Sequence, residues 1–248
     1  MVMTSKGSTS LTLLCDAFEA IERAGSADEL RTQMQRFTQS MGFEHFAYAL
    51  TINTPSFRPQ QYFLNGYPAK WVERYLALDY FKEDPIVRHA RSSSLPALWA
   101  EQRFHDRNSA GFWDEARSIG LSAGVSFAVH EQPAVAGIFS LARAGSLDLP
   151  PAELAALVGR AQIFASLLHH AVSRIDLPRL LPEQSIALTA REKECLKWAA
   201  EGKTAWEIGQ ILSISERTAV FHLNNMMQKL GASNRTQSIV RAVALKLF

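Results

Sequence analysis

Two capping boxes within the last sixty or so residues constrain this chain more than any other feature of its sequence. In the first, Thr189 precedes Glu192 by three residues, and in the second, Thr204 precedes Glu207 by the same spacing. Each side chain of such a pair can bond the backbone N–H of the other residue, so the pattern marks a helix start. Gly202 lies between the boxes and can adopt the positive φ that ends a helix. The spacing therefore predicts two short helices joined by a tight turn.

A third helix is predicted from Ser215 to about Leu230, after a turn over residues 213–215. The positions at core-facing spacing are Ala219, Leu223, Met226 and Leu230. The positions on the outward face are Arg217, Val220, Phe221, Asn224 and Gln228. A short helix, a tight turn and a second helix with such a face is the arrangement that enters the major groove in helix-turn-helix proteins. Generic helical hairpins share this periodicity, so spacing alone leaves DNA binding open.

The remaining helices of this segment are expected to complete a small core. In the second helix the predicted buried stripe is Ile208, Ile211 and Leu212. Ser233 is predicted to cap a fourth helix. The residues of that helix predicted to cover the other three are Ile239, Val240, Val243 and Leu247.

The segment 188–248 resembles the C-terminal DNA-binding domain of the LuxR and FixJ/NarL regulators. The resemblance rests on LTAREKECL, EGKTAWEIGQIL, SISERTAVFH and KLGASNRTQSIVRA, with Ala219 standing where the family usually has valine. It implies that Val220 and Asn224 contact bases, and asparagine suits an adenine edge. The resemblance also implies a set of phosphate or neighbouring contacts, namely Lys203, Thr204, Ser215, Arg217, Thr218 and Phe221.

The charge distribution is consistent with this assignment. Residues 189–248 carry 9 Lys and Arg against 5 Asp and Glu, which leaves +4, whereas residues 1–188 carry 17 against 19, which leaves −2. A basic excess on the DNA-binding segment is what phosphate contact requires, although a basic face is often merely solvated.

The cysteines indicate the cellular compartment of the protein, and the absence of known catalytic and metal-binding motifs argues against an enzyme or a metal protein. Cys15 and Cys195 fall in different predicted helices, so we interpret them as reduced and buried. No run of about 18 apolar residues and no signal peptide is found, which predicts a cytoplasmic protein without membrane association. No HExxH, CxxC, P-loop or GxSxG motif occurs, so we expect neither an enzyme nor a metal site. His169 and His170 are expected at the surface or in a dimer contact.

The first 176 residues alternate between helix and strand patterns. After a flexible N-terminus over residues 1–9, a helix ends near Ala24 and a second is capped by Ser26 with Glu29. Strands are predicted at 45–52, 60–64, 124–131 and 137–142, helices at 68–75, 85–89 and 112–119, and the longest helix from Pro150 to about Ile175. We therefore expect an α/β domain over residues 10–176, an α-β-α layered sandwich with an antiparallel sheet, then a linker over 177–187 and the all-α helix-turn-helix domain over 188–248.

Hydrogen-bonding groups on large apolar side chains are concentrated between residues 67 and 113. The set is Tyr67, Trp71, Tyr75, Asp84 and Trp99. Trp only donates, Tyr does either and an ionised Asp only accepts, so together they suit a buried ligand with an amide or ester head. The alternative is that the aromatic residues are core and that Asp84 only caps the helix behind Pro85. Composition alone favours the alternative.

This region resembles the autoinducer-binding domain of LuxR-type quorum-sensing receptors. The resemblance rests on YPAKW at 67–71, on Tyr75, on Asp84 with Pro85, on Trp99 and on GLSAGV at 120–125. It implies an N-acyl-homoserine lactone as ligand and no cofactor. Trp71 would donate to the lactone carbonyl, Asp84 would accept from the amide N–H, and Tyr67 would donate to the amide carbonyl. The implied wall residues are Tyr75, Trp99, Phe112, Leu121 and Gly124, and Ser140 is implied to contact the acyl carbonyl region.

One position departs from that pattern and leaves the acyl chain open. Ile86 stands where several family members have Thr or Ser, which removes one hydrogen bond to the head group. The segment DPIVRH as a whole is most similar to an orphan receptor of the family with broad ligand selectivity.

The two resemblances together imply a ligand-controlled regulator. The ligand would complete an under-packed core and stabilise a homodimer. The dimer would set two recognition helices about 34 Å apart on a near-palindromic site in double-stranded DNA. Two alternatives are an N-terminal domain that serves protein interaction without this ligand, and a lactone-degrading enzyme tethered to DNA.

Overall fold

The computed structural model describes residues 5–52, 60–106, 109–132, 135–180, 187–244 and 247. The chain divides into two compact units, an N-terminal unit made of most of residues 1–179 and a C-terminal unit that includes residues 180–248. Each unit has its own buried core. The boundaries 10–176, 177–187 and 188–248 remain predictions.

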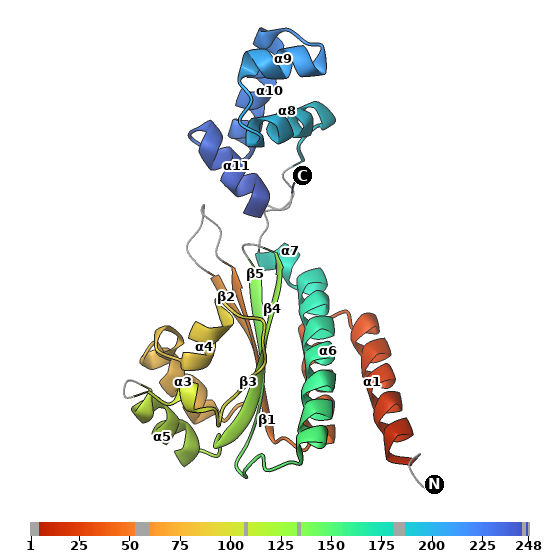
Figure 1. Ribbon diagram of the computed structural model, residues 1–248, viewed down its shortest axis with the longest axis vertical. Coiled ribbons are helices and arrows are strands. Elements are labelled where there is room, and N and C mark those ends of the chain that lie inside the picture. Colours follow the sequence, from red (N-terminus) through yellow and green to blue (C-terminus); the bar gives the residue numbers. More distant parts are fainter. Residues whose placement is uncertain are drawn as a thin grey trace. The chain divides into compact units, whose positions relative to one another are not determined.

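The N-terminal unit is built around a five-stranded antiparallel sheet (Figure 1). Its spatial order is β2-β1-β5-β4-β3. The strands are β1 His45–Ile52, β2 Gln60–Asn65, β3 Ala97–Leu98, β4 Ala123–Gln132 and β5 Val135–Arg143. The four longer strands confirm the predicted ones. The two-residue strand β3, which pairs with β4 through Ala97 and Ser126, lies in a segment predicted to be a loop and is too short to give an alternating pattern.

Helices lie on both faces of this sheet, so the predicted α-β-α sandwich is confirmed (Figure 1). One face is covered by α2 Ala27–Ser40 and α6 Pro151–Ile175, with α1 Ser5–Arg23 packed against these two helices, and the other by α3 Ala69–Ala77, α4 Pro85–Ala90 and α5 Ala110–Ser118. Short 3-10 helices, η1 Tyr80–Lys82 and η2 Gln102–Phe104, flank α4. Ser26 caps α2 by accepting from the Glu29 N–H, as the sequence predicted.

The face under α2 and α6 is closed by aromatic packing. The Phe37 ring stacks on Phe164 with centroids 3.8 Å apart, and Phe139 of the sheet lies 5.3 Å from Phe164. His169 lies in this core, contrary to its predicted surface position, and its Nδ1 is 2.8 Å from the Tyr48 hydroxyl. A Cβ on Gly137 would meet both polar groups, so glycine is required where the pair crosses β5.

Three further expectations for the N-terminal unit differ from the structure. Helix α1 begins at Ser5, so residues 5–9 are helical rather than irregular, because one glycine lowers helix propensity without ending a helix. Cys15 is exposed rather than buried. The predicted linker begins with the helical turn α7 Leu177–Leu180, since Pro178 stands in a first turn, where proline is tolerated. Residues 181–186 of the linker lie outside the described residues.

The C-terminal unit contains α8 Ala190–Ala200, α9 Ala205–Leu212, α10 Glu216–Lys229 and α11 Arg235–Ala244. Both predicted capping boxes are present, at Thr189 with Glu192 and at Thr204 with Glu207. Gly209 allows α9 to pack closely against the turn that leads into α10. A Cβ at this position would lie only 2.9 Å from the Ile214 carbonyl oxygen. The predicted buried face of the third helix is confirmed.

The surface of this unit corrects three predictions. Ile211 is exposed, as are Val240 and Val243. In α11 the buried positions are Ser238 and Ala242, because small residues four apart let the helix approach its neighbours closely. Asn234, not Ser233, caps α11, since Asn234 Oδ1 accepts from the Gln237 N–H at 2.8 Å.

None of the helices that the structure describes has the length and apolar character that crossing a bilayer requires.

Candidate ligand cavity and DNA-contacting helix

A cavity of about 240 Å³ lies between the sheet and helices α3 to α5. Its volume is near the lower end of what small-ligand sites usually offer. Phe63 and Leu76 line it and are also exposed, so the cavity reaches solvent beside them. The lining residues from the sheet are Ala47, Ala49, Phe63, Asn65, Ser126, Ile138 and Ser140.

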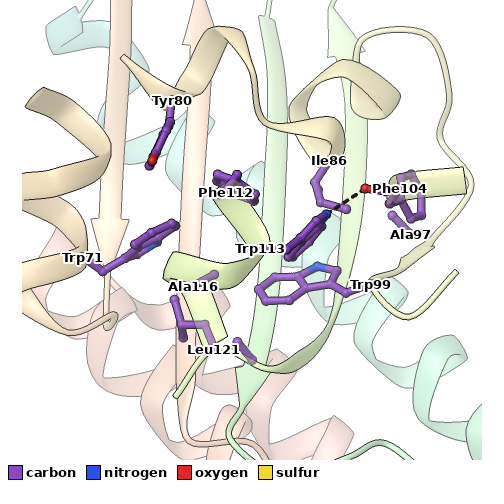
Figure 2. Close-up of a cluster of buried hydrophobic side chains, with 11 residues drawn as sticks. Trp71, Tyr80, Ile86, Ala97, Trp99, Phe104, Phe112, Trp113, Ala116 and Leu121 are labelled. Atoms are coloured by element: carbon purple, nitrogen blue, oxygen red, sulfur yellow. Dashed lines mark hydrogen bonds between the residues drawn. The ribbon is translucent and has the colours of Figure 1, made fainter. Parts of the chain in front are cut away.

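The wall opposite the sheet is a connected array of aromatic rings (Figure 2). Trp71 lies 5.5 Å from Phe112 and 5.8 Å from Tyr75 between ring centroids, and Trp99 lies 5.4 Å from Trp113. The Trp113 N–H donates to the Phe104 carbonyl oxygen at 2.7 Å, which fixes that ring (Figure 2). Edge-on and tilted contacts of this kind hold rings in defined positions, so the wall is preformed.

Asp84 both caps α4 and faces the cavity, so the two roles that the sequence offered as alternatives coexist. Its Oδ1 accepts from the Ile86 N–H at 2.8 Å, and its Oδ2 accepts from the Tyr75 hydroxyl at 2.9 Å. Burial raises the pKa of the Asp84 carboxyl to about 6, although these hydrogen bonds favour the ionised form. Near neutral pH a largely ionised carboxylate is therefore held in an aromatic cavity.

The two tyrosines beside Asp84 remain hydroxyl donors. Burial, and then the negative charge of Asp84, raise the pKa of Tyr75 and of Tyr67 well above the ordinary value for a phenol. The Tyr75 hydroxyl donates to Asp84, and the Tyr67 hydroxyl interacts with Ser140.

Trp71 contributes a further donor. Within the described part of the chain, no acceptor bonds its indole N–H, whereas the N–H groups of Trp99 and Trp113 are both bonded. A ligand carbonyl is the kind of group that would pair with this N–H.

Ser126 is a cavity residue that sequence reasoning missed. Its hydroxyl accepts from the Trp99 N–H at 2.9 Å and lies 2.7 Å from the Ser140 hydroxyl across the β4-β5 pair. The signal was present, because Val125 and Phe127 on either side are buried in the closed face and Ser126 must point to the other.

Nine of the ten residues assigned to the ligand from sequence line the cavity. They are Tyr67, Trp71, Tyr75, Asp84, Ile86, Trp99, Phe112, Leu121 and Ser140. Gly124 does not. A Cβ at Gly124 would lie 2.7 Å from the Trp99 ring, so this glycine allows the indole to pack directly on β4. Gly124 therefore supports Trp99, which lines the cavity, and is not itself a lining residue.

The outward face of α10 is assembled as the sequence predicted. Arg217, Val220, Phe221, Asn224 and Gln228 are all exposed. At 100° per residue these positions fall within about 100° of arc, opposite the buried Ala219, Leu223 and Met226. The apolar Val220 and Phe221 are 40% and 59% exposed, and the Phe221 ring contacts that of its neighbour His222.

The remaining predicted DNA contacts lie at helix starts. Ser215 caps α10 by accepting from the Thr218 N–H, and the two hydroxyls lie 2.8 Å apart. Thr204 caps α9, and Lys203 just before it pairs with Glu207 at 3.9 Å. The N-termini of helices present N–H groups and a positive dipole, which favour phosphate.

Comparisons with known proteins give family matches for both parts of the chain. The family model "Autoinducer binding domain" matches residues 26–172, and "Bacterial regulatory proteins, luxR family" matches residues 186–242. The transcriptional activator protein SolR of Ralstonia nicotianae is 39% identical over 233 residues, covering 94% of this chain and 98% of SolR. AnoR of Acinetobacter nosocomialis, also a transcriptional activator protein, is 34% identical over the same coverage.

Solved structures give the same result. Escherichia coli SdiA has a TM-score of 0.79 and 28% identity, covering 98% of this chain and 99% of that one. A structure of SdiA in complex with octanoyl-rac-glycerol has a TM-score of 0.78 and 29% identity, covering 99% of this chain and 97% of that one.

A preformed ligand cavity on one unit and a helix-turn-helix on the other define a ligand-responsive transcriptional regulator. The chain belongs to the LuxR family of bacterial regulators, in the group that carries an autoinducer-binding domain. It is a quorum-sensing transcriptional regulator.

Proposed function

We propose that the cavity binds an N-acyl-homoserine lactone and that the loaded protein binds promoter DNA as a homodimer. The single observation that carries the lactone is the pairing of opposite hydrogen-bonding needs in one aromatic cavity. Asp84 offers a carboxylate oxygen, and Trp71 offers an N–H without an acceptor among the described residues. A ligand head with both an amide N–H and a carbonyl satisfies both groups at once.

The roles within the head-group site follow from donor and acceptor chemistry. Asp84 accepts from the amide N–H, Trp71 donates to the lactone carbonyl, and Tyr67 with Ser140 donates to the amide carbonyl. Ile86 presents only an alkyl side chain and packs against the ring. The apolar tail then runs along the remaining aromatic and aliphatic wall, where burial of each CH₂ contributes about 0.8 kcal/mol. No cofactor is part of this scheme.

For the homodimer we assign the exposed face of α6. Most of its residues are small or apolar, with His170 also exposed on it, and a Cβ on Gly159 would meet nothing within 4 Å, so a second helix can approach. Ile163, which is 50% exposed, lies one turn further along that face. Two copies of α10 then read a near-palindromic site in double-stranded DNA, with half-sites about one helical turn apart.

On each half-site, Val220 and Asn224 contact bases. Lys203, Arg217 and Thr218 contact phosphates, and Thr204, Ser215 and Phe221 flank them. We place this activity in the cytoplasm, where promoter DNA is accessible, and away from membranes. We assign no catalytic or metal role to any residue.

The test is expression of the full chain in a host that makes no lactones, with and without a panel of N-acyl-homoserine lactones. Soluble yield, native mass and mass spectrometry of the bound molecules are measured. We expect a soluble dimer with one lactone per chain. A soluble dimer that is empty and indifferent to every lactone would instead support an N-terminal unit for protein interaction. Release of opened lactone would support an enzyme.

A matched pair of variants separates ligand contact from packing. Tyr67→Phe removes a hydroxyl that lines the cavity, whereas Tyr80→Phe removes one that bonds Glu115 outside it. One hydrogen bond contributes about 1 kcal/mol, so Tyr67→Phe should weaken lactone binding by roughly fivefold. Tyr80→Phe should leave lactone binding within a factor of about two. Equal losses in both would contradict the assigned role of Tyr67.

A further inference from the structure

Two apolar side chains stand among polar ones on the outward face of α10. Val220 and Phe221 are exposed. The exposed neighbours on either side of them along the helix, Arg217 and Asn224, are polar. Residues three and four apart on a helix are surface neighbours, with Cβ atoms about 5 to 6 Å apart. Val220, Phe221 and Asn224 therefore form one patch, in which two apolar groups adjoin an amide.

The fold beneath this patch holds it in place. Ala219 and Leu223, on the opposite side of α10, are buried in the core of the C-terminal unit, which sets the rotation of the helix. The Phe221 ring meets the His222 ring edge-on, with centroids 5.6 Å apart, and contacts of this kind hold rings in defined positions. The Asn224 amide bonds no group in the described part of the chain, so its donor and its acceptor are both available to a base.

The size and the charge of the surroundings suit a nucleic acid better than a protein partner. Two exposed side chains cover far less area than the roughly 800 Å² per partner that a stable protein interface buries. Residues 189–248 carry 9 Lys and Arg against 5 Asp and Glu, and Arg217 directly adjoins the apolar pair. A small apolar patch beside positive charge fits the major groove, which has phosphates along its edges and an apolar group on one of its bases.

That apolar group is the C5-methyl of thymine. We infer that Val220 and Phe221 read thymine methyl groups, and that these thymines lie within one or two base pairs of the adenine bonded by Asn224. This inference rests on the proposed function, in which Asn224 contacts a base edge. The range follows from spacing, because side chains about 5 to 6 Å apart span about one to two steps of a duplex that rises about 3.4 Å per base pair.

Phe221 thereby becomes a base contact instead of a residue that flanks the phosphate contacts. The asparagine amide distinguishes adenine from guanine through the N6 and N7 atoms, and the apolar pair distinguishes thymine from cytosine, which has no methyl group. Burial of one methyl group corresponds to roughly fourfold in affinity. Each half-site should therefore contain a short stretch of A·T base pairs opposite this part of α10.

The test removes the methyl group from the DNA. The full chain, purified after expression with N-octanoyl homoserine lactone, selects its operator at fixed salt from duplexes with a randomised centre. Each thymine of the selected half-site is then replaced singly by deoxyuridine, which lacks only the C5-methyl. We expect about fourfold weaker binding for one or two thymines within two base pairs of a selected adenine, and a change below about twofold at the others.

Two variants assign the methyl groups to side chains. Val220→Ser and Phe221→Ser replace exposed side chains, so both variants should fold. Each should bind the thymine operator more weakly than the unaltered chain does, and each should lose the deoxyuridine penalty at the thymine that its side chain reads. Gln228→Ala, at an exposed position further along the same face, is the matched control and should keep every penalty.

The possible outcomes separate this inference from the proposed function. A selected half-site without thymine near the adenine, or deoxyuridine without effect at every such thymine, would overturn the inference and leave base recognition by Asn224 intact. A penalty that survives in both serine variants would also overturn it, because the loss would then come from the DNA itself. Equal affinity for selected and random duplexes would overturn the proposed function, and this inference with it.

Discussion

The two units of the chain differ in how complete each is alone. In the C-terminal unit the core is continuous, and four helix starts are capped by Thr189, Thr204, Ser215 and Asn234. In the N-terminal unit one face of the sheet is closed by Phe37, Phe139 and Phe164, whereas the other contains a cavity and a buried carboxylate.

This difference assigns the two halves of the function. A cavity leaves wall atoms without packing partners, and a buried ionised carboxylate is costly, so the cavity face of the N-terminal unit gains stability when a ligand fills it. In the C-terminal unit the buried carboxylate, Glu192, is paired with Lys229 at 2.7 Å, and apolar side chains on the outward face of α10 are exposed. The N-terminal unit is therefore the ligand-binding unit, and the C-terminal unit is the DNA-binding unit.

The largest expected effect is that of the lactone on the stability of each unit. At a free concentration a thousand times Kd, a bound lactone should stabilise the N-terminal unit by about 4 kcal/mol. The residues that line the cavity all belong to the N-terminal unit, so the C-terminal unit should not respond. Scanning calorimetry of the full chain checks this by following the two unfolding transitions. Equal shifts in both transitions would break the contrast between the units.

Asp84→Asn tests the cost of the buried carboxylate. Asparagine also caps helices, so the fold is kept. The folded pKa of Asp84 is raised, so its contribution to stability is fully present below the unfolded pKa of 3.8 and is lost as pH rises through about 6. A shift of about two units corresponds to about 3 kcal/mol, so the unliganded variant should be more stable by that order at pH 7.

The same variant should lose this pH dependence between about pH 4 and 6, and it should bind lactone more weakly because the amide loses its acceptor. Urea unfolding of the ligand-free protein across this range measures both slopes. Asp114→Asn, at an exposed carboxylate, is the control and should change nothing. Unaltered stability and pH slope in Asp84→Asn would show that the carboxylate is not held at a cost.

Asn224→Ala and Arg217→Ala test the proposed DNA contacts of α10. Asn224→Ala should lose discrimination at one base pair by about 1 to 3 kcal/mol, whereas Arg217→Ala should weaken binding to operator and random DNA alike. Titrations of both variants against a selected operator and a scrambled duplex at fixed salt measure the difference. Loss of affinity for both duplexes in Asn224→Ala would contradict its role as a base contact.

The smallest effect concerns a helix cap in the C-terminal unit. Thr204→Ala removes the hydroxyl that accepts from the Glu207 N–H and should destabilise this unit by about 1 kcal/mol. Thr236→Ala, at an exposed position within α11, should be neutral or slightly stabilising. A loss in the N-terminal transition instead would contradict independent stability of the units.

The C-terminal unit was well predicted because its signals are local. A capping box needs only four consecutive residues, and both boxes formed as expected. The errors there concern Ile211, Val240 and Val243, which are apolar and exposed. Which side of a short helix is buried depends on how its neighbours are rotated, and periodicity does not contain that information.

The cavity was predicted in part, for a different reason. Spacing grouped Tyr67, Trp71 and Asp84, but it could not decide between packing and ligand contact, and Asp84 does both. Gly124 was predicted to line the cavity and does not, whereas Ser126 was not predicted and does. The glycine instead accommodates the ring of Trp99, which lies 25 residues earlier in the chain. The alternation along β4 placed Ser126 on the cavity face, but only the folded structure brings the Trp99 ring onto that strand.

The most direct test of the contrast between the units is amide hydrogen exchange of the full chain with and without bound lactone. The account predicts slower exchange on lactone binding in α3, α4, α5 and the strands β4 and β5, with little change in α8 to α11. Protection spread evenly over both units, or none around the cavity, would contradict the claim that the lactone completes the N-terminal unit alone.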